Sequence, residues 1–320
     1  MRAWQVLTLA DAPRIVSIPD PQPLPGEVLV RVSAAGLNFA DLLMLDGRYQ
    51  EKPALPYIPG MEIAGVVEAV GPGTDGPQPG TRVIGVCRTG GLAEMACVPA
   101  AHLVVMPDAM PMTVGAGFQI AYGTSHLALT HKARLQPGET LLVTGAAGGV
   151  GLTAVEIGKR LGARVIASAR GKDRLAVAKA AGADVVIDAT APDLKETLRS
   201  LGGVDVVYDT VGGPAFDKAL SACKPDGRLL AIGFASGHVP QVPANVLLVK
   251  NLTVTGFWYG GYQKTFPTLV ADSMSQLLCW YANGGLAPHI SHVLPFDALA
   301  EGLDLLRNRT ATGKVVINVA

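Results

Sequence analysis

The sequence predicts an α/β fold in which a doubly wound parallel sheet is inserted into a β-rich domain. Between residues 116 and 255, apolar runs alternate with stretches of helical period, and successive runs begin about 20 residues apart. Between residues 1 and 115, short β-rich runs are separated by Gly and Pro, which is typical of small β-barrels. These two patterns predict two domains, and 320 residues are enough for each domain to bury its own core.

The apolar runs between residues 116 and 255 have the composition of buried parallel strands. Such strands are nearly continuous in Val, Ile and Leu because helices cover both faces of their sheet. The runs are TLLVTGA, ARVIASA, ADVVID, VDVVYDTVG and GRLLAIGF, and helical segments such as LTAVEIGKRLG and KDRLAVAKAAG lie between them. A strand–helix repeat of this kind predicts a parallel sheet with helices on both sides.

The segment from residue 256 to 320 is too short to form a domain of its own. It contains two helical candidates, TLVADSMSQLLCWYANG and DALAEGLDLLRNRT, followed by a final strand, GKVVINV. We expect this segment to return to the first region and to complete it as a partly open β-barrel. The parallel-sheet domain, residues 116–255, is then an insertion between 1–115 and 256–320.

Composition and charge exclude several classes of protein. Basic and acidic side chains number 26 each, so the formal net charge is zero and a nucleic-acid partner is not expected. No apolar run is long enough to span a membrane, and the opening residues lack the apolar core of a signal peptide. The four cysteines, Cys87, Cys97, Cys223 and Cys279, form no CxxC pair. We therefore expect free thiols in a cytoplasmic protein rather than a disulfide or zinc framework.

The most informative motif is the turn AAGGVG at residues 146–151, which joins an apolar strand directly to a helical segment. Its spacing fits G-x-G-x-x-G, with Ala146, Gly148 and Gly151 at the three glycine positions. In a Rossmann domain these positions allow a tight turn, close approach of the pyrophosphate and close packing of helix on strand. The helix N-terminus then offers N–H groups to the phosphates. A glycine-rich turn without a ligand is the alternative, and the flanking strand and helix favour a dinucleotide.

The end of the next strand indicates which dinucleotide binds. NAD-binding domains place an acidic residue there to bind the ribose hydroxyls. Here the strand ends in Ser168-Ala169-Arg170, and Lys172 and Arg174 follow. Such a cluster suits the 2′-phosphate of NADPH, which a carboxylate would repel. The alternative is that these cations lie on a solvated helix start, where they interact unfavourably with the helix dipole.

Several longer motifs together resemble one enzyme family. They are GLNFADLLMLDGRY, LPYIPGMEIAGVVEAVG, AYGTSHLAL, LVTGAAGGVG, YDTVGG, LTVTGFWYG and GKVVINV. Over essentially the whole chain they resemble the medium-chain dehydrogenase/reductase superfamily, and within it the quinone oxidoreductase, or zeta-crystallin-like, branch. The resemblance implies a GroES-like catalytic domain around the Rossmann domain, NADPH as cofactor and hydride transfer to a small electrophile.

The metal ligands of zinc-dependent relatives are replaced in this chain. Where those relatives carry Gly-His-Glu, the sequence reads Gly60-Met61-Glu62, and Asn38 stands where their zinc-binding cysteine falls. The cysteine-rich lobe of those relatives is also missing. Without thiolate and imidazole a zinc site is not expected, and Glu62 is interpreted as a structural carboxylate.

The resemblance also assigns cofactor contacts by position. They are Asn38, Tyr49, Ala147, Gly148, Gly149, Val150, Arg170 and Arg174, then Ile232, Gly233, Phe234 and Ala235 after the fifth strand, and Phe257, Trp258 and Lys314 in the returning segment. Lys172 is added because of its place in the basic cluster.

Asn38 and Tyr49 are the candidate catalytic residues. A metal-free reductase must orient its acceptor and donate a hydrogen bond to the oxygen that gains negative charge. The Asn38 amide does not titrate in the working range, so it is interpreted as an orienting group. The Tyr49 hydroxyl could deliver a proton, or it could serve only as a contact that covers the cofactor.

Three functions remain open from the sequence. The first is NADPH-dependent reduction of quinones or α,β-unsaturated carbonyls. The second is reduction of a short enoyl-CoA thioester, and the third is NADPH binding without catalysis. The resemblance also implies a homodimer, and LTVTGFWYGGY offers a strand with exposed aromatic residues that could pair across a two-fold axis. A strand buried within one subunit is the alternative.

Overall fold

The chain forms two units, each built around its own sheet. The computed structural model describes residues 1–320. Unit 1 contains Met1–Ile120 and Pro288–Ala320, and unit 2 contains Ala121–Ala287. The chain thus leaves unit 1, forms unit 2 and returns, as the sequence predicts. The return comes later than expected, because residues 256–287 belong to unit 2.

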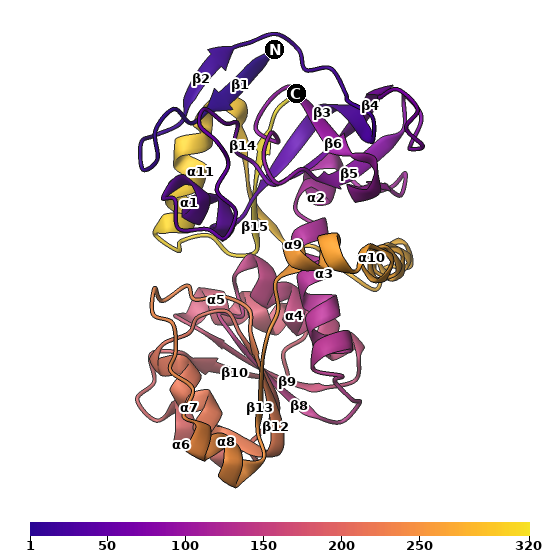
Figure 1. Cartoon of the computed structure of the whole chain (residues 1–320). Coiled ribbons are helices and arrows are strands. Elements are labelled where there is room, and N and C mark those ends of the chain that lie inside the picture. Colours follow the sequence, from indigo (N-terminus) through magenta and orange to yellow (C-terminus); the bar gives the residue numbers. More distant parts are fainter. The chain divides into compact units, whose positions relative to one another are not determined.

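A six-stranded parallel sheet forms the centre of unit 2 (Figure 1). Its order is β10-β9-β8-β11-β12-β13, the doubly wound arrangement predicted from the apolar runs. The strands are β8 (Thr140–Thr144), β9 (Arg164–Ala169), β10 (Val185–Asp188), β11 (Val204–Asp209), β12 (Cys223–Ala231) and β13 (Thr253–Gly256). The chain runs outward from β8 in one direction and from β11 in the other, so helices cover both faces of the sheet.

A helix follows every strand of this sheet, and two helical segments precede the first strand. The helices are α3 (Gln119–Leu127), the π-helical turn η2 (Ala128–Lys132), α4 (Gly149–Arg160), α5 (Lys172–Ala180), α6 (Leu194–Ser200), α7 (Pro214–Ala222), α8 (Ala244–Lys250), α9 (Tyr259–Thr265) and α10 (Pro267–Ala282). Side chains such as Leu142, Val207 and Leu229 are completely buried between sheet and helices. Each such side chain contributes about 1.5–3 kcal/mol relative to an exposed one.

Unit 1 contains a seven-stranded sheet organised around one long strand, β3 (Glu27–Leu37). Residues of β3 pair with β4, β6 and β15, all antiparallel. The strands are β4 (Glu62–Val70), β5 (Arg82–Val86), β6 (Met95–Pro99), β7 (Leu103–Val105), β14 (Ile290–Pro295) and β15 (Lys314–Asn318). The path ends at β14 and β7, which agrees with the expected partly open β domain.

Short elements cover the sheet of unit 1. They are the hairpin β1 (Arg2–Gln5) and β2 (Arg14–Ser17), α1 (Phe39–Leu45), η1 (Ala100–His102), α2 (Met112–Ala116), η3 (Phe296–Ala298) and α11 (Leu299–Arg307). Helix α2 approaches β3 at Gly36, where an added Cβ would lie 2.1 Å from the carbonyl oxygen of Ala116. Only glycine fits such a contact. None of the helices in either unit is long and apolar enough to cross a membrane.

Candidate functional site

The turn between β8 and α4 is tight, but its positive-φ residue is Gly145, one residue before Ala146, to which the motif assigned the turn. Gly145 follows β8 with φ +62°, and an added Cβ there would lie 2.3 Å from Oγ1 of Thr210. At Gly151, in the first turn of α4, an added Cβ would lie 2.2 Å from the carbonyl oxygen of Gly145. Both positions exclude larger residues because backbone and side-chain atoms leave no space. The motif alanine, Ala146, is completely buried.

The N-terminus of α4 is open to a ligand. Its cap residue Gly148 is exposed and has no side chain that could accept hydrogen bonds from the first N–H groups. The N–H groups of Gly149, Val150 and Gly151 therefore lie at the positive end of a 12-residue helix without a side-chain cap. This arrangement suits a phosphate group.

A network of buried hydroxyl groups forms hydrogen bonds to the first turn of α4. Ser125 on α3 bonds through Oγ to the carbonyl oxygen of Val150 at 2.9 Å, to Thr153 at 2.7 Å and to Tyr208 at 2.9 Å. Burial raises the pKa of Tyr208, so its hydroxyl stays neutral. This role could not be predicted from the motif AYGTSHLAL, because the partners of Ser125 lie 25 to 83 residues further along the chain.

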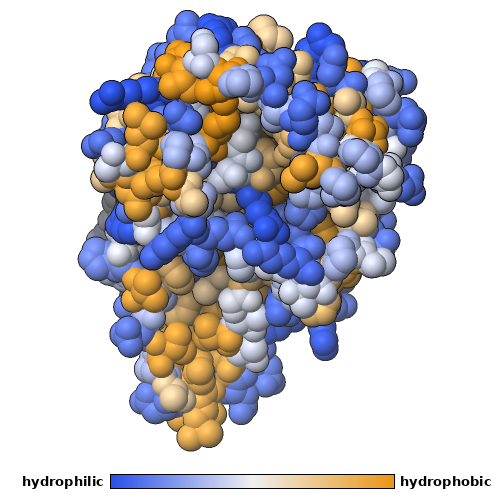
Figure 2. Space-filling view, turned by 45° about the horizontal axis from the view of Figure 1, so that its top comes forward, coloured by the Kyte–Doolittle hydropathy of each residue, from blue (hydrophilic) through white to orange (hydrophobic).

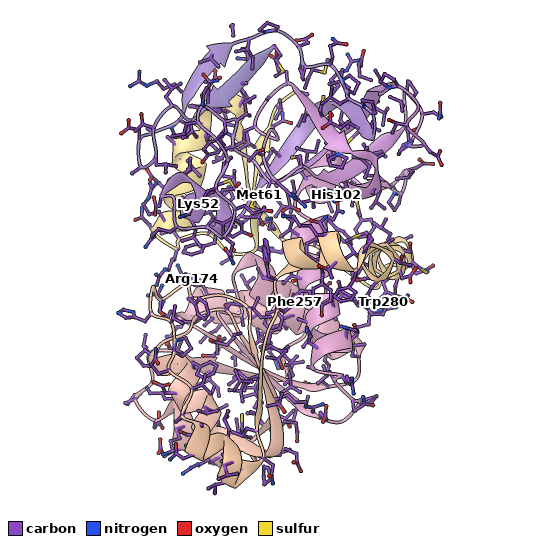
Figure 3. All side chains as sticks on the ribbon, viewed as in Figure 1. Lys52, Met61, His102, Arg174, Phe257 and Trp280 are labelled. Carbon is purple, nitrogen blue, oxygen red and sulfur yellow. The ribbon has the colours of Figure 1, made fainter.

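The three basic residues of the predicted specificity cluster lie together after β9. Arg170 and Lys172 are exposed, and Arg174 donates a hydrogen bond to the carbonyl oxygen of Arg170 at 3.2 Å. Arg174 is labelled in Figure 3. The nearby Asp188 carboxylate at the end of β10 accepts hydrogen bonds from the N–H and hydroxyl groups of Thr190 at 2.9 and 2.8 Å. The Asp188 carboxylate also accepts the N–H of Gly171 at 3.4 Å, so one acidic group lies beside these cations.

The predicted loop Ile232–Ala235 follows β12 and lies beside the loop that follows β11. The N–H of Ile232 donates to the carbonyl oxygen of Asp209 at 2.9 Å, and the N–H of Ala235 donates to that of Thr210 at 3.1 Å. Phe234 is 39% exposed. Three predicted contact segments of unit 2 thus lie at the carboxyl ends of its parallel strands, where open α/β sheets bind ligands. They are the turn at residues 145–151, called the phosphate turn below, the basic cluster and this loop.

Phe257 and Trp258 lie elsewhere than expected. The sequence predicts them in the segment 256–320 that completes the first domain, but both belong to unit 2. Phe257 is buried, its N–H donates to the carbonyl oxygen of Ala231, and its ring centroid lies 4.8 Å from that of Tyr262 (Figure 3). Trp258 is half-buried. The expectation of an exposed aromatic strand is therefore wrong for Phe257, and β13 ends before it, at Gly256.

In unit 1, Lys314 forms a buried cluster with Asn38 and Glu62. The Lys314 ammonium group donates to the carbonyl oxygen of Leu37, to Oδ1 of Asn38 and to Oε1 of Glu62, each at 2.7 Å. Lys314 is 6% exposed and Glu62 is 1% exposed. All three ammonium protons thus have acceptors within unit 1, so this arrangement does not support the predicted direct contact of Lys314 with a cofactor.

The same cluster immobilises Asn38. Its Nδ2 donates to Oε1 of Glu62 at 3.0 Å and, over 3.4 Å, to the carbonyl oxygen of Gly36. The other carboxylate oxygen of Glu62 accepts the N–H of Ile120 at 3.0 Å. Glu62 is the structural carboxylate that the sequence predicts. Since both amide groups of Asn38 are engaged, its side chain is held in one orientation by its neighbours.

Asp41 and Tyr49 follow Asn38 closely in the sequence. The N–H of Asn38 donates to Oδ2 of Asp41 at 2.8 Å and so begins α1. Burial raises the pKa of Asp41 to about 7, and the Lys314 charge and two backbone hydrogen bonds oppose that rise. Tyr49 is half-buried and packs against the core of unit 1. Met61, labelled in Figure 3, is buried in that core.

Two family profiles match the chain. The profile for the alcohol dehydrogenase GroES-like domain matches residues 24–108, and the profile described as zinc-binding dehydrogenase matches residues 149–276. A curated relative, quinone oxidoreductase-like protein 2 homolog of Nematostella vectensis, is 41% identical over 91% of this chain and 81% of its own length.

The chain belongs to the quinone oxidoreductase branch of the medium-chain dehydrogenase/reductase superfamily.

Solved quinone oxidoreductases share the fold over the full length of the chain. The Thermus thermophilus enzyme, solved also in complex with NADPH, superposes with a TM-score of 0.88, is 33% identical, and each chain is covered completely. The Escherichia coli quinone oxidoreductase complexed with NADPH gives a TM-score of 0.91 at 27% identity, with 99% of each chain covered. The predicted fold and branch are confirmed, and the predicted cofactor agrees with these complexes.

The Lys314–Glu62 pair yields a prediction about stability. Replacing Lys314 by Met leaves the buried Glu62 carboxylate without its counter-charge, so we expect a loss of about 3–5 kcal/mol in the free energy of unfolding. The double variant Lys314→Met, Glu62→Gln removes both charges and should recover part of that loss. Denaturant unfolding of the three proteins measures this. Equal losses in the single and double variants would contradict a charge-pairing role.

Proposed function

We propose that this chain binds NADPH in unit 2 and catalyses transfer of its hydride to a quinone or an α,β-unsaturated carbonyl compound. The observation that carries the proposal is the uncapped N-terminus of α4 behind a turn that only glycine can form. The membership of the chain in a branch whose solved members include NADPH complexes supports it. We also propose a cytoplasmic location, because all four cysteines are free thiols.

The residues of unit 2 fit the two charged parts of NADPH. The pyrophosphate would accept hydrogen bonds from the N–H groups of Gly149 and Val150, with Ala147 and Gly148 allowing close backbone approach. The 2′-phosphate would be bound by Arg170, Lys172 and Arg174. Charge-assisted hydrogen bonds of this kind are about twice as strong as neutral ones.

When bound, NADPH supplies two electrons and a hydrogen from its nicotinamide ring, and the protein contributes position and electrostatics. The loop Ile232–Ala235, held by its bonds to the β11 loop, would contact the nicotinamide half of the cofactor. Tyr49 or water would supply the proton that the oxygen of the reduced acceptor requires. Asn38, held by Lys314 and Glu62, is proposed as an orienting group.

The acceptor class separates the remaining functions. Reduction of a quinone or enone requires only a polarised carbonyl, whereas an enoyl-CoA thioester also carries phosphates that need cationic contacts. Oxidation of NADPH by the purified protein should be followed with a naphthoquinone, a simple enone and crotonyl-CoA. We expect turnover with the first two. Turnover with crotonyl-CoA alone would favour an enoyl-thioester reductase, and NADPH binding without turnover on any acceptor would favour a binding protein.

The basic cluster yields a prediction about cofactor preference. The double variant Arg170→Ala, Arg174→Ala should lower the preference for NADPH over NADH about tenfold or more, because two charge-assisted contacts to the 2′-phosphate are lost. Titration with both cofactors measures the ratio of the two Kd values. Lys179→Ala is a matched control, since Lys179 lies on the same helix and bonds to the carbonyl oxygen of Asp184. An unchanged ratio in the double variant would refute this role.

We further propose that the chain forms a homodimer through the β13 edge of unit 2. β13 is the last strand of its sheet, and an unpaired edge is a template for a second copy. Beside it in the sequence, α8 exposes Leu248 at 79% and Val249 at 80%. Figure 2 shows apolar surface gathered at the end of unit 2 that carries α8. A two-fold partner would cover this surface.

Sedimentation of the purified protein tests the proposed dimer. We expect a dimer for the wild type and a shift toward monomer for Leu248→Glu, Val249→Glu, because two charges would face the apolar contact. Leu7→Glu is the control, since Leu7 is also exposed, at 51%, but lies in unit 1. A wild-type protein that sediments strictly as a monomer would rule the dimer out.

A further inference from the structure

The two central strands of unit 2, β8 and β11, border the point where the sheet changes direction. β8 connects to β9 on one side, and β11 connects to β12 on the other. The turn after β8 and the loop after β11 therefore diverge, and the crevice between such loops is where doubly wound sheets bind ligands. The spacing of these two loops determines the width of that crevice.

Side chains join the two strands beyond the end of their regular pairing. The regular pairing of β8 with β11 ends at Val143 and Tyr208. One residue further, the Thr144 hydroxyl donates a hydrogen bond to Oδ1 of Asp209. The N–H of Thr210 donates to Oγ1 of Thr144 at 3.1 Å, and the Thr210 hydroxyl donates to the carbonyl oxygen of Thr144 at 2.9 Å. Three hydrogen bonds thus fix the base of one loop against the base of the other.

The Asp209 carboxylate also shapes its own loop. It accepts the N–H of Gly212 at 2.8 Å and that of Val211 at 3.3 Å. Asp209 is completely buried, and burial raises its pKa while these hydrogen bonds and that of Thr144 oppose the rise. A buried carboxylate with several donors is costly to leave unsatisfied, so each donor is held in place.

Thr210, which is hydrogen-bonded to Thr144, also contacts the phosphate turn. Gly145 packs so closely on the Thr210 hydroxyl that no Cβ fits between them. The Asp209 carbonyl oxygen in turn accepts the N–H of Ile232, the first residue of the loop proposed to contact the nicotinamide half. Thr144 and Asp209 therefore connect the loops that follow β8, β11 and β12.

We infer that Thr144 and Asp209 are positioning residues that set the spacing between the phosphate turn and the nicotinamide-side loops, and that this spacing determines the affinity for the complete dinucleotide. The inference rests on the proposed binding of NADPH. Neither residue contacts the cofactor in this account. The basic cluster after β9 takes no part in the hydrogen bonds of Thr144 and Asp209. Binding of the adenosine half should therefore not depend on Thr144 or Asp209.

Asp209→Asn and Thr144→Val test the inference. An asparagine amide has one oxygen and would place its NH₂ group against an N–H or O–H donor, and valine keeps the shape of threonine without its hydrogen bonds. Kd values should be measured by titration with NADPH and with adenosine 2′,5′-bisphosphate. We expect the Kd for NADPH to rise at least tenfold in each variant, and the Kd for the bisphosphate to change less than twofold. If Asp209→Asn fails to fold, Thr144→Val supplies the same comparison.

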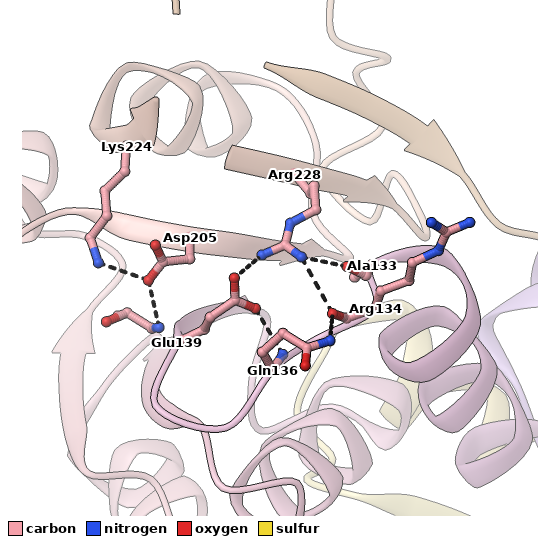
Figure 4. A network of polar contacts seen from close by, with 8 residues as sticks. Ala133, Arg134, Gln136, Glu139, Asp205, Lys224 and Arg228 are labelled. Carbon is pink, nitrogen blue, oxygen red and sulfur yellow. Dashed lines mark hydrogen bonds and ion pairs between the residues drawn. The ribbon is translucent and has the colours of Figure 1, made fainter. Parts of the chain in front are cut away.

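Asp205 provides a matched control at the opposite end of the same strand. Its carboxylate accepts the N–H of Thr140 on β8 at 2.8 Å and pairs with Lys224 at 2.7 Å (Figure 4). Asp205→Asn therefore weakens the same strand pair away from the loops, and both Kd values should stay unchanged.

Three results would overturn the inference. They are an unchanged NADPH Kd in both variants, equal weakening of NADPH and the bisphosphate, and an Asp205→Asn effect as large as that of Asp209→Asn. A wild-type protein that binds no NADPH would overturn the proposed function itself.

Discussion

The close approach of Gly151 to Gly145 is the constraint on which the binding side of unit 2 depends. With an added Cβ only 2.2 Å from the Gly145 carbonyl oxygen, α4 can begin directly above the end of β8. That placement leaves the first N–H groups of α4 without side-chain acceptors and points the positive end of the helix at the strand ends. A single methyl group at Gly151 would move the helix and remove this arrangement.

Unit 1 depends on a different kind of interaction, a single buried ion pair that orders its neighbours. Lys314 comes from the last strand, Glu62 from β4 and Asn38 from the residue before α1. Their hydrogen bonds join three segments that are distant in sequence, and Glu62 also accepts the N–H of Ile120 at the end of the first stretch of unit 1. At the two positions where zinc-dependent relatives carry a cysteine and a histidine ligand, this chain has Asn38 and Met61.

Local patterns in the sequence predicted the order of elements and the phosphate turn, because strand period and glycine spacing are encoded by neighbouring residues. They did not predict that residues 256–287 remain with unit 2. That placement follows from contacts with other parts of unit 2, such as Phe257 N–H to the carbonyl oxygen of Ala231 and the hydrogen bond between His126 and Ser273. The roles of Ser125, Thr144 and Asp209 were missed for the same reason, since each is defined by partners far along the chain.

The most direct test of the central claim is hydrogen exchange of the backbone amides in the first turn of α4. Peptides that span residues 145–152 should be followed by mass spectrometry with and without saturating NADPH. We expect slower exchange at Gly149 and Val150 in the presence of NADPH, because the pyrophosphate would accept their hydrogen bonds. NADPH binding that leaves exchange in this segment unchanged would contradict the claim that the helix N-terminus holds the cofactor.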